Sequence, residues 1–444
     1  MQYQSTRDKN LKASSAQAIL NGLAPDGGLY TMPSFDEVKF DYTTVLNMDT
    51  MSMSTKILSK LLPDFSEAEM AKLVHDGYTG KFETDHLTPT VPVGEDFILE
   101  LFRGPTSAFK DVALSMLPRL MTASKEKLGV DDEIMILTAT SGDTGKAAME
   151  GFCDVPGTKI IVFYPHGGVS AVQQAQMATQ EGSNVCVCAV RGNFDDAQTG
   201  VKNIFAACQD KDLHGVRLSS ANSINIGRLA PQVMYYFRAY ADLVKAGRIR
   251  VGDTVHYVVP TGNFGDILAG YFAKLMGLPV GKLVCASNAN DVLTEFLSTG
   301  VYDKRRPFHK TTSPSMDILV SSNLERMLYL LSDGDDAYVA GLMRQLRGPL
   351  SGHGQDARAA ARDFLLRLLR RCAGRRGHGP RLARARLRLR PAHGRRVARG
   401  GCVHGAGGRC AGRRSVHGVS LQVPGGGALR AGRGAGRRRV RDDG

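Results

Sequence analysis

Apolar and polar positions alternate along the middle of the chain in a repeating order. Short apolar runs rich in β-branched residues recur there, each followed by a turn with Gly or Asn and then by an amphipathic stretch of helical length. We expect strands at residues 133–137, 159–164, 184–190, 254–259 and 282–286. We expect helices at residues 146–152, 169–180, 195–208, 228–246 and 267–276. Strands that alternate with helices predict an open, mostly parallel α/β sheet, which binds ligands at the carboxyl ends of its strands.

The two ends of the chain differ from this middle part. Residues 1–85 have a mainly helical pattern, and the letters SEAE at 66–69 indicate a helix-capping box, so we expect an accessory domain there. Residues 86–346 form the α/β region. Residues 347–444 are rich in Arg, Gly and Ala and contain no Lys, Glu, Ile, Asn, Thr, Tyr or Met. Such a composition cannot bury enough apolar surface to fold, and it predicts a disordered tail.

The positive net charge of the chain, +14, comes entirely from that tail. From residue 347 onward, 25 Arg stand against 4 Asp, a net charge of +21, so that the first 346 residues carry −7. An Arg/Gly-rich arm that contacts the phosphates of RNA or DNA is one alternative. The tail has no interleaved aromatic residues on which bases could stack, however, and we expect no nucleic-acid partner.

Composition also argues against a membrane or metal protein. No apolar run approaches the 18 or so residues of a membrane span, and the N-terminus lacks the apolar core of a signal peptide. We therefore expect a cytoplasmic enzyme with no membrane partner. No C-x-x-C pair and no Cys/His cluster accompanies the eight Cys, which favours reduced thiols over disulfides or a metal site.

A lysine lies at a predicted junction between a strand and a helix. Residues 102–111 read FRGPTSAFKD, after the apolar run 97–101 and before the helical pattern 112–122. At such a junction Lys110 can be partly desolvated, which lowers the pKa of its amine and suits Schiff-base chemistry. Taken alone, an ordinary surface lysine is the simpler interpretation.

Two glycine-rich loops follow predicted strands and open predicted helices. Residues 138–146 read TATSGDTGK and contain Ser141, Asp143 and Thr144, while residues 259–266 read VPTGNFGD. Free backbone N–H groups and the helix dipole at such loops bind phosphate or carboxylate. Plain turns are the alternative for each loop alone. Neither loop has the nucleotide P-loop pattern or a dinucleotide-binding G-x-G-x-x-G, so two anionic groups in one site are the better interpretation.

A third polar segment precedes the long predicted helix. Residues 222–228 read NSINIGR, and the amide of Asn225 and the guanidinium of Arg228 could position a substrate phosphate. A capped helix start with a surface arginine is an equally simple interpretation of this segment by itself.

Taken together, these segments resemble the threonine synthase family of pyridoxal-phosphate (PLP) enzymes. The resemblance covers residues 1–346, and its motifs occur in the family's order. They are STRD at 5–8, LAPDGGLY at 23–30, GPTSAFKD at 104–111, SGDTG at 141–145, NSIN at 222–225, PTGNFGD at 260–266, PSMD at 314–317 and SSNLER at 321–326.

This resemblance implies a fold, a reaction and roles for residues. The fold would be fold-type II, similar to the tryptophan synthase β subunit, with two lobes and a helical N-terminal domain, in a monomer or homodimer. The reaction would convert O-phospho-L-homoserine and water to L-threonine and phosphate, with Lys110 as Schiff-base lysine and catalytic proton carrier. The PLP phosphate would be held by Gly262, Asn263, Phe264, Gly265 and Asp266. The substrate would be faced by Ser141, Asp143, Thr144, Asn225 and Arg228.

The tail departs from the family. Family members end with segments like DPHTAV and STASPYKF, and neither occurs here. Back-translation of PAHGRR at 391–396 and of VHGVSLQVP at 416–424 allows both segments in one shifted reading frame, in the family's order. We therefore interpret residues after about 350 as out of frame. The final family segment offers a hydroxyl to the PLP ring, so the 444-residue chain is expected to be unstable and poorly active.

Two other functions fit the same motifs. Another fold-type II enzyme, such as a serine/threonine dehydratase or a cysteine synthase, would act on a substrate without phosphate. A noncatalytic protein that binds a phosphorylated small molecule would lack a PLP absorbance band sensitive to borohydride.

Overall fold

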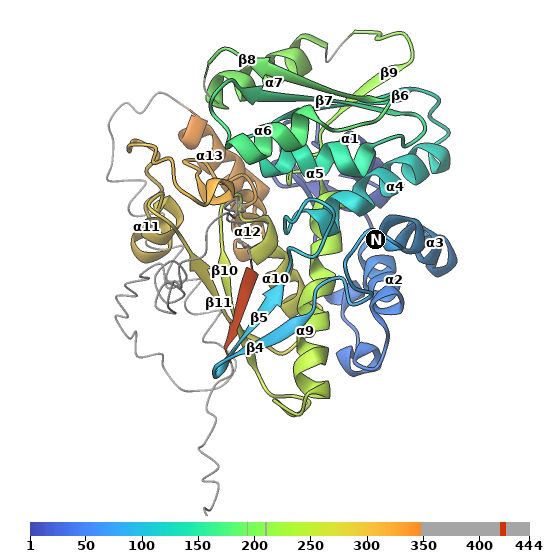
Figure 1. The fold of residues 1–444 in the computed structure, drawn as a ribbon, viewed down its shortest axis with the longest axis vertical. Helices are drawn as coiled ribbons and strands as arrows, with labels where there is room; N and C mark the ends of the chain where they lie inside the picture. The colour runs from blue at the N-terminus through green and yellow to red at the C-terminus, as the bar shows by residue number, and fades with distance from the viewer. Residues whose placement is uncertain (193, 209–210, 348–417, 423–444) are drawn as a thin grey trace, which may run out of the picture.

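Two β-sheets with helices packed on them form the body of the protein. The computed structural model describes residues 1–192, 194–208, 211–347 and 418–422. Figure 1 shows a four-stranded sheet in one lobe and a five-stranded sheet in the other, with helices between and around them. Within the described residues, no helix is long and apolar enough to cross a membrane.

The four-stranded sheet is parallel throughout. Its strands lie in the order β8, β7, β6, β9, which span Val185–Val190, Thr158–Pro165, Glu133–Ala139 and Val216–Ser219. Helices α5 (Asp143–Phe152), α6 (Ala171–Ala178) and α7 (Phe194–Cys208) connect these strands. The strands β6, β7 and β8 and the three helices confirm the pattern expected from the sequence, with ends shifted by one to three residues, while β9 was not expected. The central strands β6 and β7 contain buried residues, whereas β8 at the sheet edge has none.

The five-stranded sheet mixes strand directions. In the order β11, β10, β12, β5, β4, its strands span Val280–Ala286, Val255–Pro260, Gly418–Gln422, Asp96–Glu100 and Thr90–Val93. Strands β10 and β11 are parallel, and every other neighbouring pair is antiparallel. In Figure 1 the red strand β12 lies between β10 and β5.

Strand β12 belongs to the segment that the sequence predicted to be disordered. The structure shows an ordered strand for Gly418–Gln422, and the remaining residues after 347 lie outside the described ranges. Two neighbouring strands offer this segment backbone hydrogen-bond partners on both edges. Since backbone pairing needs no particular side chain, a sequence of low apolar content can occupy that position.

The N-terminal residues add a small sheet and three helices. Antiparallel strands β2 (Lys12–Ala13), β1 (Tyr3–Ser5) and β3 (Tyr30–Thr31) form the sheet. Helix α3 (Glu67–Tyr78) begins with the capping box that the sequence indicated, in which Ser66 and Glu69 bond each other's backbone. Side chains from this region share one hydrophobic cluster with the two lobes. The other two helices are α1 (Ser15–Asn21) and α2 (Thr50–Leu61).

Seven further α-helices complete the described part of the chain, and α4 and α9 are the longest of them. Helix α4 packs against α1, α3, α5 and α8 and is buried along most of its length. The helix expected at 228–246 is instead split into α8 and α9 by a 3-10 turn at Ala230–Gln232, because Pro231 lacks the N–H of a helix interior. These helices are α4 (Asp111–Lys127), α8 (Ile226–Leu229), α9 (Val233–Lys245), α10 (Gly265–Leu275), α11 (Val292–Thr299), α12 (Leu324–Leu331) and α13 (Asp336–Arg347).

Candidate functional site

Lys110 lies at the start of the central helix α4. It occupies the position just before the first helical residue, and its side chain is buried, with 8% of the residue exposed. The preceding turn is fixed by Asp111, whose carboxylate accepts hydrogen bonds from the Thr106 N–H at 2.9 Å and from the Ala108 N–H at 3.3 Å. A Cβ added at Gly104 would lie 2.5 Å from Asp111, so this turn has no room for a side chain there. The turn therefore holds Lys110 in one place.

The environment of Lys110 favours the neutral amine. Burial lowers the pKa of Lys110 to about 8, the nearby carboxylate of Asp143 opposes that shift, and the charge of Arg228 adds to it. The amine donates a hydrogen bond to Ser315 Oγ at 3.1 Å and lies 3.8 Å from Asp143 Oδ2. With a pKa near 8, about a tenth of the amine is unprotonated at neutral pH, far more than for an ordinary lysine, and nucleophilic attack on a carbonyl requires that form.

The 138–146 loop brings Asp143 to this amine. Thr140 Oγ1 accepts hydrogen bonds from the N–H groups of Gly142 at 3.0 Å and Gly145 at 2.9 Å, which tightens the turn before α5. Asp143 is the first residue of α5, and its Oδ1 accepts a hydrogen bond from Gln173 Nε2 at 2.7 Å. Its other oxygen accepts a hydrogen bond from Ser315 Oγ. Asp143 is thus oriented towards Lys110 from both sides.

The 262–265 loop presents backbone donors between β10 and α10. The N–H groups of Gly262, Asn263 and Phe264 donate to no acceptor within the described residues. Phe264 holds the left-handed conformation, with φ of 63°, a strained geometry that occurs at ligand-binding turns. Free N–H groups at the start of an 11-residue helix form a site for an anionic group.

Arg228 is a second buried charge near Lys110. The residue is 5% exposed, and burial lowers the pKa of its guanidinium to about 10. Its Nη1 donates to the Ala221 carbonyl at 2.6 Å, while its Nε has no hydrogen-bond partner in the described part of the chain. A buried guanidinium with an unused donor fits an anionic ligand, because an unpaired buried donor is costly.

The structure brings together only part of the predicted site. Lys110 and Asp143 meet directly, and the charges of Arg228 and Asp266 are close enough to shift the pKa of Lys110. Asn225 is instead held by the protein: its Oδ1 accepts from the Gly227 N–H at 2.8 Å, and its Nδ2 donates to the Ile19 carbonyl at 2.9 Å. The side chains of Ser141 and Thr144 are half-buried on the same loop as Asp143.

Ser315 was not predicted as a site residue. It lies in the 3-10 turn Pro314–Met316 and bridges Lys110 and Asp143. Its segment, PSMD, had been recognised as a family motif, but nothing in the local sequence indicated that its hydroxyl would face a lysine 205 positions earlier. Within the described residues, there is no cluster of side chains that could hold a metal ion.

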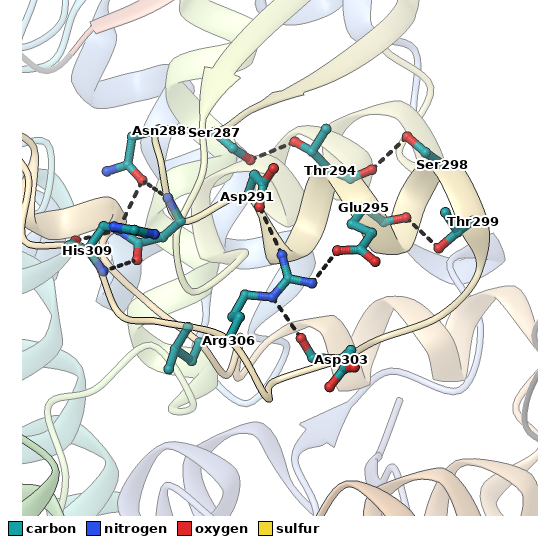
Figure 2. A network of polar contacts seen from close by, with 12 residues as sticks. Ser287, Asn288, Asp291, Thr294, Glu295, Ser298, Thr299, Asp303, Arg306 and His309 are labelled. Atoms are coloured by element: carbon teal, nitrogen blue, oxygen red, sulfur yellow. Dashed lines mark hydrogen bonds and ion pairs between the residues drawn. The ribbon is translucent and has the colours of Figure 1, made fainter. Parts of the chain in front are cut away.

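A polar network supports the turn that carries Ser315. Figure 2 shows Arg306 between Asp291 and Glu295 of the α11 region, with the Arg306 Nη1 to Asp291 Oδ1 distance at 2.9 Å. Beside it, Asn290 Nδ2 donates to the His309 carbonyl at 2.7 Å and to Asp317 Oδ1 at 2.9 Å. These contacts connect the two ends of the segment 288–317, and they hold the turn that carries Ser315 in place.

We predict that Gly262→Ala weakens cofactor binding and stability together. A Cβ at Gly262 would lie 2.5 Å from the backbone oxygen of Ser315, which cannot move without the turn that contacts Lys110. Overpacking of this kind costs about 1–3 kcal/mol. Thermal unfolding and PLP titration measure both effects. Gly341→Ala, where an added Cβ meets open space in α13, is the matched control, and equal behaviour of the two variants would contradict the prediction.

Comparison with known proteins places these residues in a family context. The family model described as threonine synthase N terminus matches residues 2–78. A threonine synthase of Pseudomonas aeruginosa is 40% identical over 346 residues, which cover 77% of this chain and 71% of that protein. Threonine synthase-like 1 of Macaca fascicularis is 39% identical over 350 residues, or 74% of this chain. The chain spans about half the length of that relative, 46% of it.

Solved structures agree with the sequence relatives. PLP-bound threonine synthase from Brucella melitensis superposes with a TM-score of 0.71 at 39% identity, covering 82% of this chain and 76% of that one. Threonine synthase from yeast superposes with a TM-score of 0.70 at 35% identity, covering 81% of this chain and 74% of that one. Both likenesses extend over most of the described residues.

Proposed function

The chain belongs to the threonine synthase family, and from this premise we propose that it converts O-phospho-L-homoserine and water to L-threonine and phosphate with PLP as cofactor. It has the α/β fold of fold-type II PLP enzymes. The observation that carries the proposal is the buried Lys110 amine with its lowered pKa, between Asp143 and the charge of Arg228. A carbon–oxygen lyase that releases phosphate needs both a proton carrier and anion donors, and this site offers both.

The residues present fit PLP. The Lys110 amine suits the cofactor's aldehyde, and the unused N–H groups of Gly262, Asn263 and Phe264 suit its phosphate. When bound, PLP supplies an electron-withdrawing ring that stabilises negative charge on substrate carbons. The roles of Gly265 and Asp266 beside the phosphate remain part of the same proposal.

The chain's own groups would then move protons and hold the substrate. With the substrate held beside it, the Lys110 amine would take the proton from the substrate Cα and then one from Cβ. Phosphate would leave from Cγ, and a proton returned to Cγ would make the methyl group of threonine. The hydroxyl of water would add at Cβ, a proton returned to Cα would complete the product, and the remaining proton of water would balance the departing phosphate. Arg228, with its unused Nε, is proposed to bind the anionic end of the substrate, and Ser141 and Thr144 are proposed to line its path. Asn225, whose amide is bonded to the Ile19 carbonyl and the Gly227 N–H, is proposed to hold the segment before Arg228 in place. Asp143 and Ser315 orient the amine between these steps.

A direct assay tests the proposal. Incubation of the purified chain with PLP and O-phospho-L-homoserine should release inorganic phosphate and L-threonine in equal amounts. Production of 2-oxobutyrate from threonine, without phosphate release from phosphohomoserine, would favour a dehydratase instead. PLP that is not fixed to Lys110 by borohydride would contradict a lysine-linked enzyme of either kind. A cytoplasmic location and a monomeric or homodimeric state are proposed with it, and fractionation and light scattering test them.

We predict that Asp143→Asn shifts cofactor capture to lower pH. Capture of the PLP aldehyde needs the neutral amine, so its rate should rise with pH through about 8, the pKa of Lys110. The Asp143 carboxylate raises that pKa, so its loss lowers the pKa and moves the midpoint of the rate profile down. Stopped-flow absorbance across pH 6 to about 10 measures the midpoint.

Two further variants test whether charge causes this shift of the midpoint. Arg228→Met removes a charge that lowers the pKa of Lys110, so its midpoint should move up. Glu150→Gln changes an acid of the same helix as Asp143 that pairs with Lys146, and its midpoint should not move. Shifts of the same sign for Asp143→Asn and Arg228→Met would contradict the electrostatic account.

A further inference from the structure

The segment Ser321 to Arg326 lies at the meeting point of three parts of the chain. Asn323 directly precedes the first residue of α12, and Asn323 and Arg326 are both fully buried. These two polar residues, here called the Asn323–Arg326 clamp, make their hydrogen bonds to distant loops as well as to each other. Complete burial of two polar side chains costs free energy unless both are hydrogen-bonded. The groups that they bond therefore indicate which segments the pair holds in place.

The first partner is the anion-binding loop. The Asn323 N–H donates to the Asn263 carbonyl at 3.0 Å, and Ser321 Oγ donates to the Gly262 carbonyl at 2.9 Å. In a trans peptide, the carbonyl of one residue points away from the N–H of the next. Holding the carbonyls of Gly262 and Asn263 towards this segment therefore turns the N–H groups of Asn263 and Phe264 to the opposite side. Those N–H groups are the unused donors of the site.

The second partner is the loop that leads to Arg228. Asn323 Nδ2 donates to the Ser223 carbonyl at 3.0 Å, and Arg326 Nη2 donates to the Ile224 carbonyl at 2.5 Å. The two loops also approach each other directly, since a Cβ added at Gly265 would lie 3.4 Å from the Ser223 Cβ and 3.7 Å from Asn323 Nδ2. Asn323 thus bonds both segments, the anion-binding loop through its backbone N–H and the segment before Arg228 through its side chain, and Arg326 holds the Asn323 side chain and the second segment.

The third partner is the N-terminal sheet. Arg326 Nε donates to the carbonyl of Tyr30 in β3 at 2.9 Å. The neighbouring Glu325 accepts from Arg7 Nε at 2.7 Å and from Thr6 Oγ1 at 2.6 Å, so the N-terminus is bound at the same place. Within the described residues, no carboxylate forms an ion pair with Arg326, and the acceptors of its guanidinium are neutral oxygens. Its planar fork of donors, which lysine lacks, is what these diverging acceptors require.

We propose that Asn323 and Arg326 are positioning residues that hold the anion-binding loop 262–265 and the 222–228 segment at one separation, with the N-terminal sheet docked on them. The inference deepens the proposed function, on which it rests, because the first loop would hold the PLP phosphate and the second the anionic substrate. Neither side chain needs to touch either ligand.

Arg326→Lys tests the clamp with two independent readouts on the full chain. Without PLP, hydrogen exchange should become about tenfold faster at two amides together: the Asn323 N–H, which bonds the Asn263 carbonyl of the anion-binding loop, and the Asn225 N–H, which bonds the Asn222 carbonyl of the other loop. With PLP, the Kd for the cofactor should rise about tenfold, from misaligned phosphate donors. Ser321→Ala removes one hydrogen bond to the Gly262 carbonyl and should give the same two changes in a smaller degree. This second variant tests the clamp if Arg326→Lys folds poorly.

Arg238→Lys is the matched control. Arg238 is also buried, with 1% exposed, but it bonds Asp242 of its own helix and the Met48 carbonyl, away from both loops. The Arg238→Lys variant should have a lower Tm. It should neither speed hydrogen exchange in the two loops nor raise the Kd for PLP. A response in only one loop for Arg326→Lys, or equal responses in both variants, would overturn the clamp. If the unmodified chain takes up no PLP, the proposed function fails, while the exchange data still decide whether the two loops are coupled.

Discussion

Lys110→Ala is expected to abolish covalent cofactor binding and to lower kcat by about 10⁴-fold or more, since one amine serves as both nucleophile and proton carrier. Lys110 is the single lysine whose amine lies beside Asp143 and Ser315 in the described part of the chain. Borohydride reduction followed by peptide mass measurement should find the cofactor on the peptide with residue 110 in the unmodified chain and on no peptide in the variant.

A lysine on the same helix provides the control for this prediction. Lys127, in the last turn of α4, pairs with Glu69 at 2.9 Å on the surface. Lys127→Ala should keep the borohydride-fixed cofactor and its activity, because exposed ion pairs contribute little. Covalent PLP retained in Lys110→Ala would mean that another lysine binds the cofactor, and the site would have to be assigned elsewhere.

Restoring the shifted reading frame after about residue 350 is expected to raise both activity and stability. The restored segment, STASPYKF, brings a Tyr and a Phe where the present sequence VHGVSLQVP has no aromatic ring of that kind. If both become buried, at about 1.5–3 kcal/mol each, the free energy of unfolding rises by about 4 kcal/mol. Since β12 is the strand that joins β10 to β5, the gain should reach the strands that lead to Lys110 and to the 262–265 loop.

The two chains can be compared side by side. The in-frame protein should melt about 5 °C higher and turn over O-phospho-L-homoserine at least tenfold faster than the 444-residue chain. A chain ending at residue 417 is the lower reference, since it lacks β12 and leaves β10 and β5 with unpaired edges. Equal activity of the in-frame and 444-residue chains would contradict the interpretation of the tail. Gene sequencing without an insertion or deletion near residues 344–358 would do so independently.

Local pattern was sufficient for most of the regular structure. The strand expected at 254–259 is β10, and the helix expected at 267–276 is α10, because alternation and amphipathicity are properties of neighbouring residues. Local pattern did not predict the interruption of a helix or the pairing of a segment of the tail. The helix expected at 228–246 is interrupted at Pro231, and the five residues of β12 pair with strands on both sides, a property that composition does not reveal.

The sequence by itself determined the motifs, the α/β order and the lysine at a junction between strand and helix, since these depend on residue types at short spacing. Only the tertiary structure decided which of those residues meet. It brought Ser315 to Lys110, used the amide of Asn225 to bind the Ile19 carbonyl, and placed Arg326 between two backbone segments that are distant in the sequence. Contacts of that kind depend on how the lobes pack, and packing joins positions that no local pattern relates.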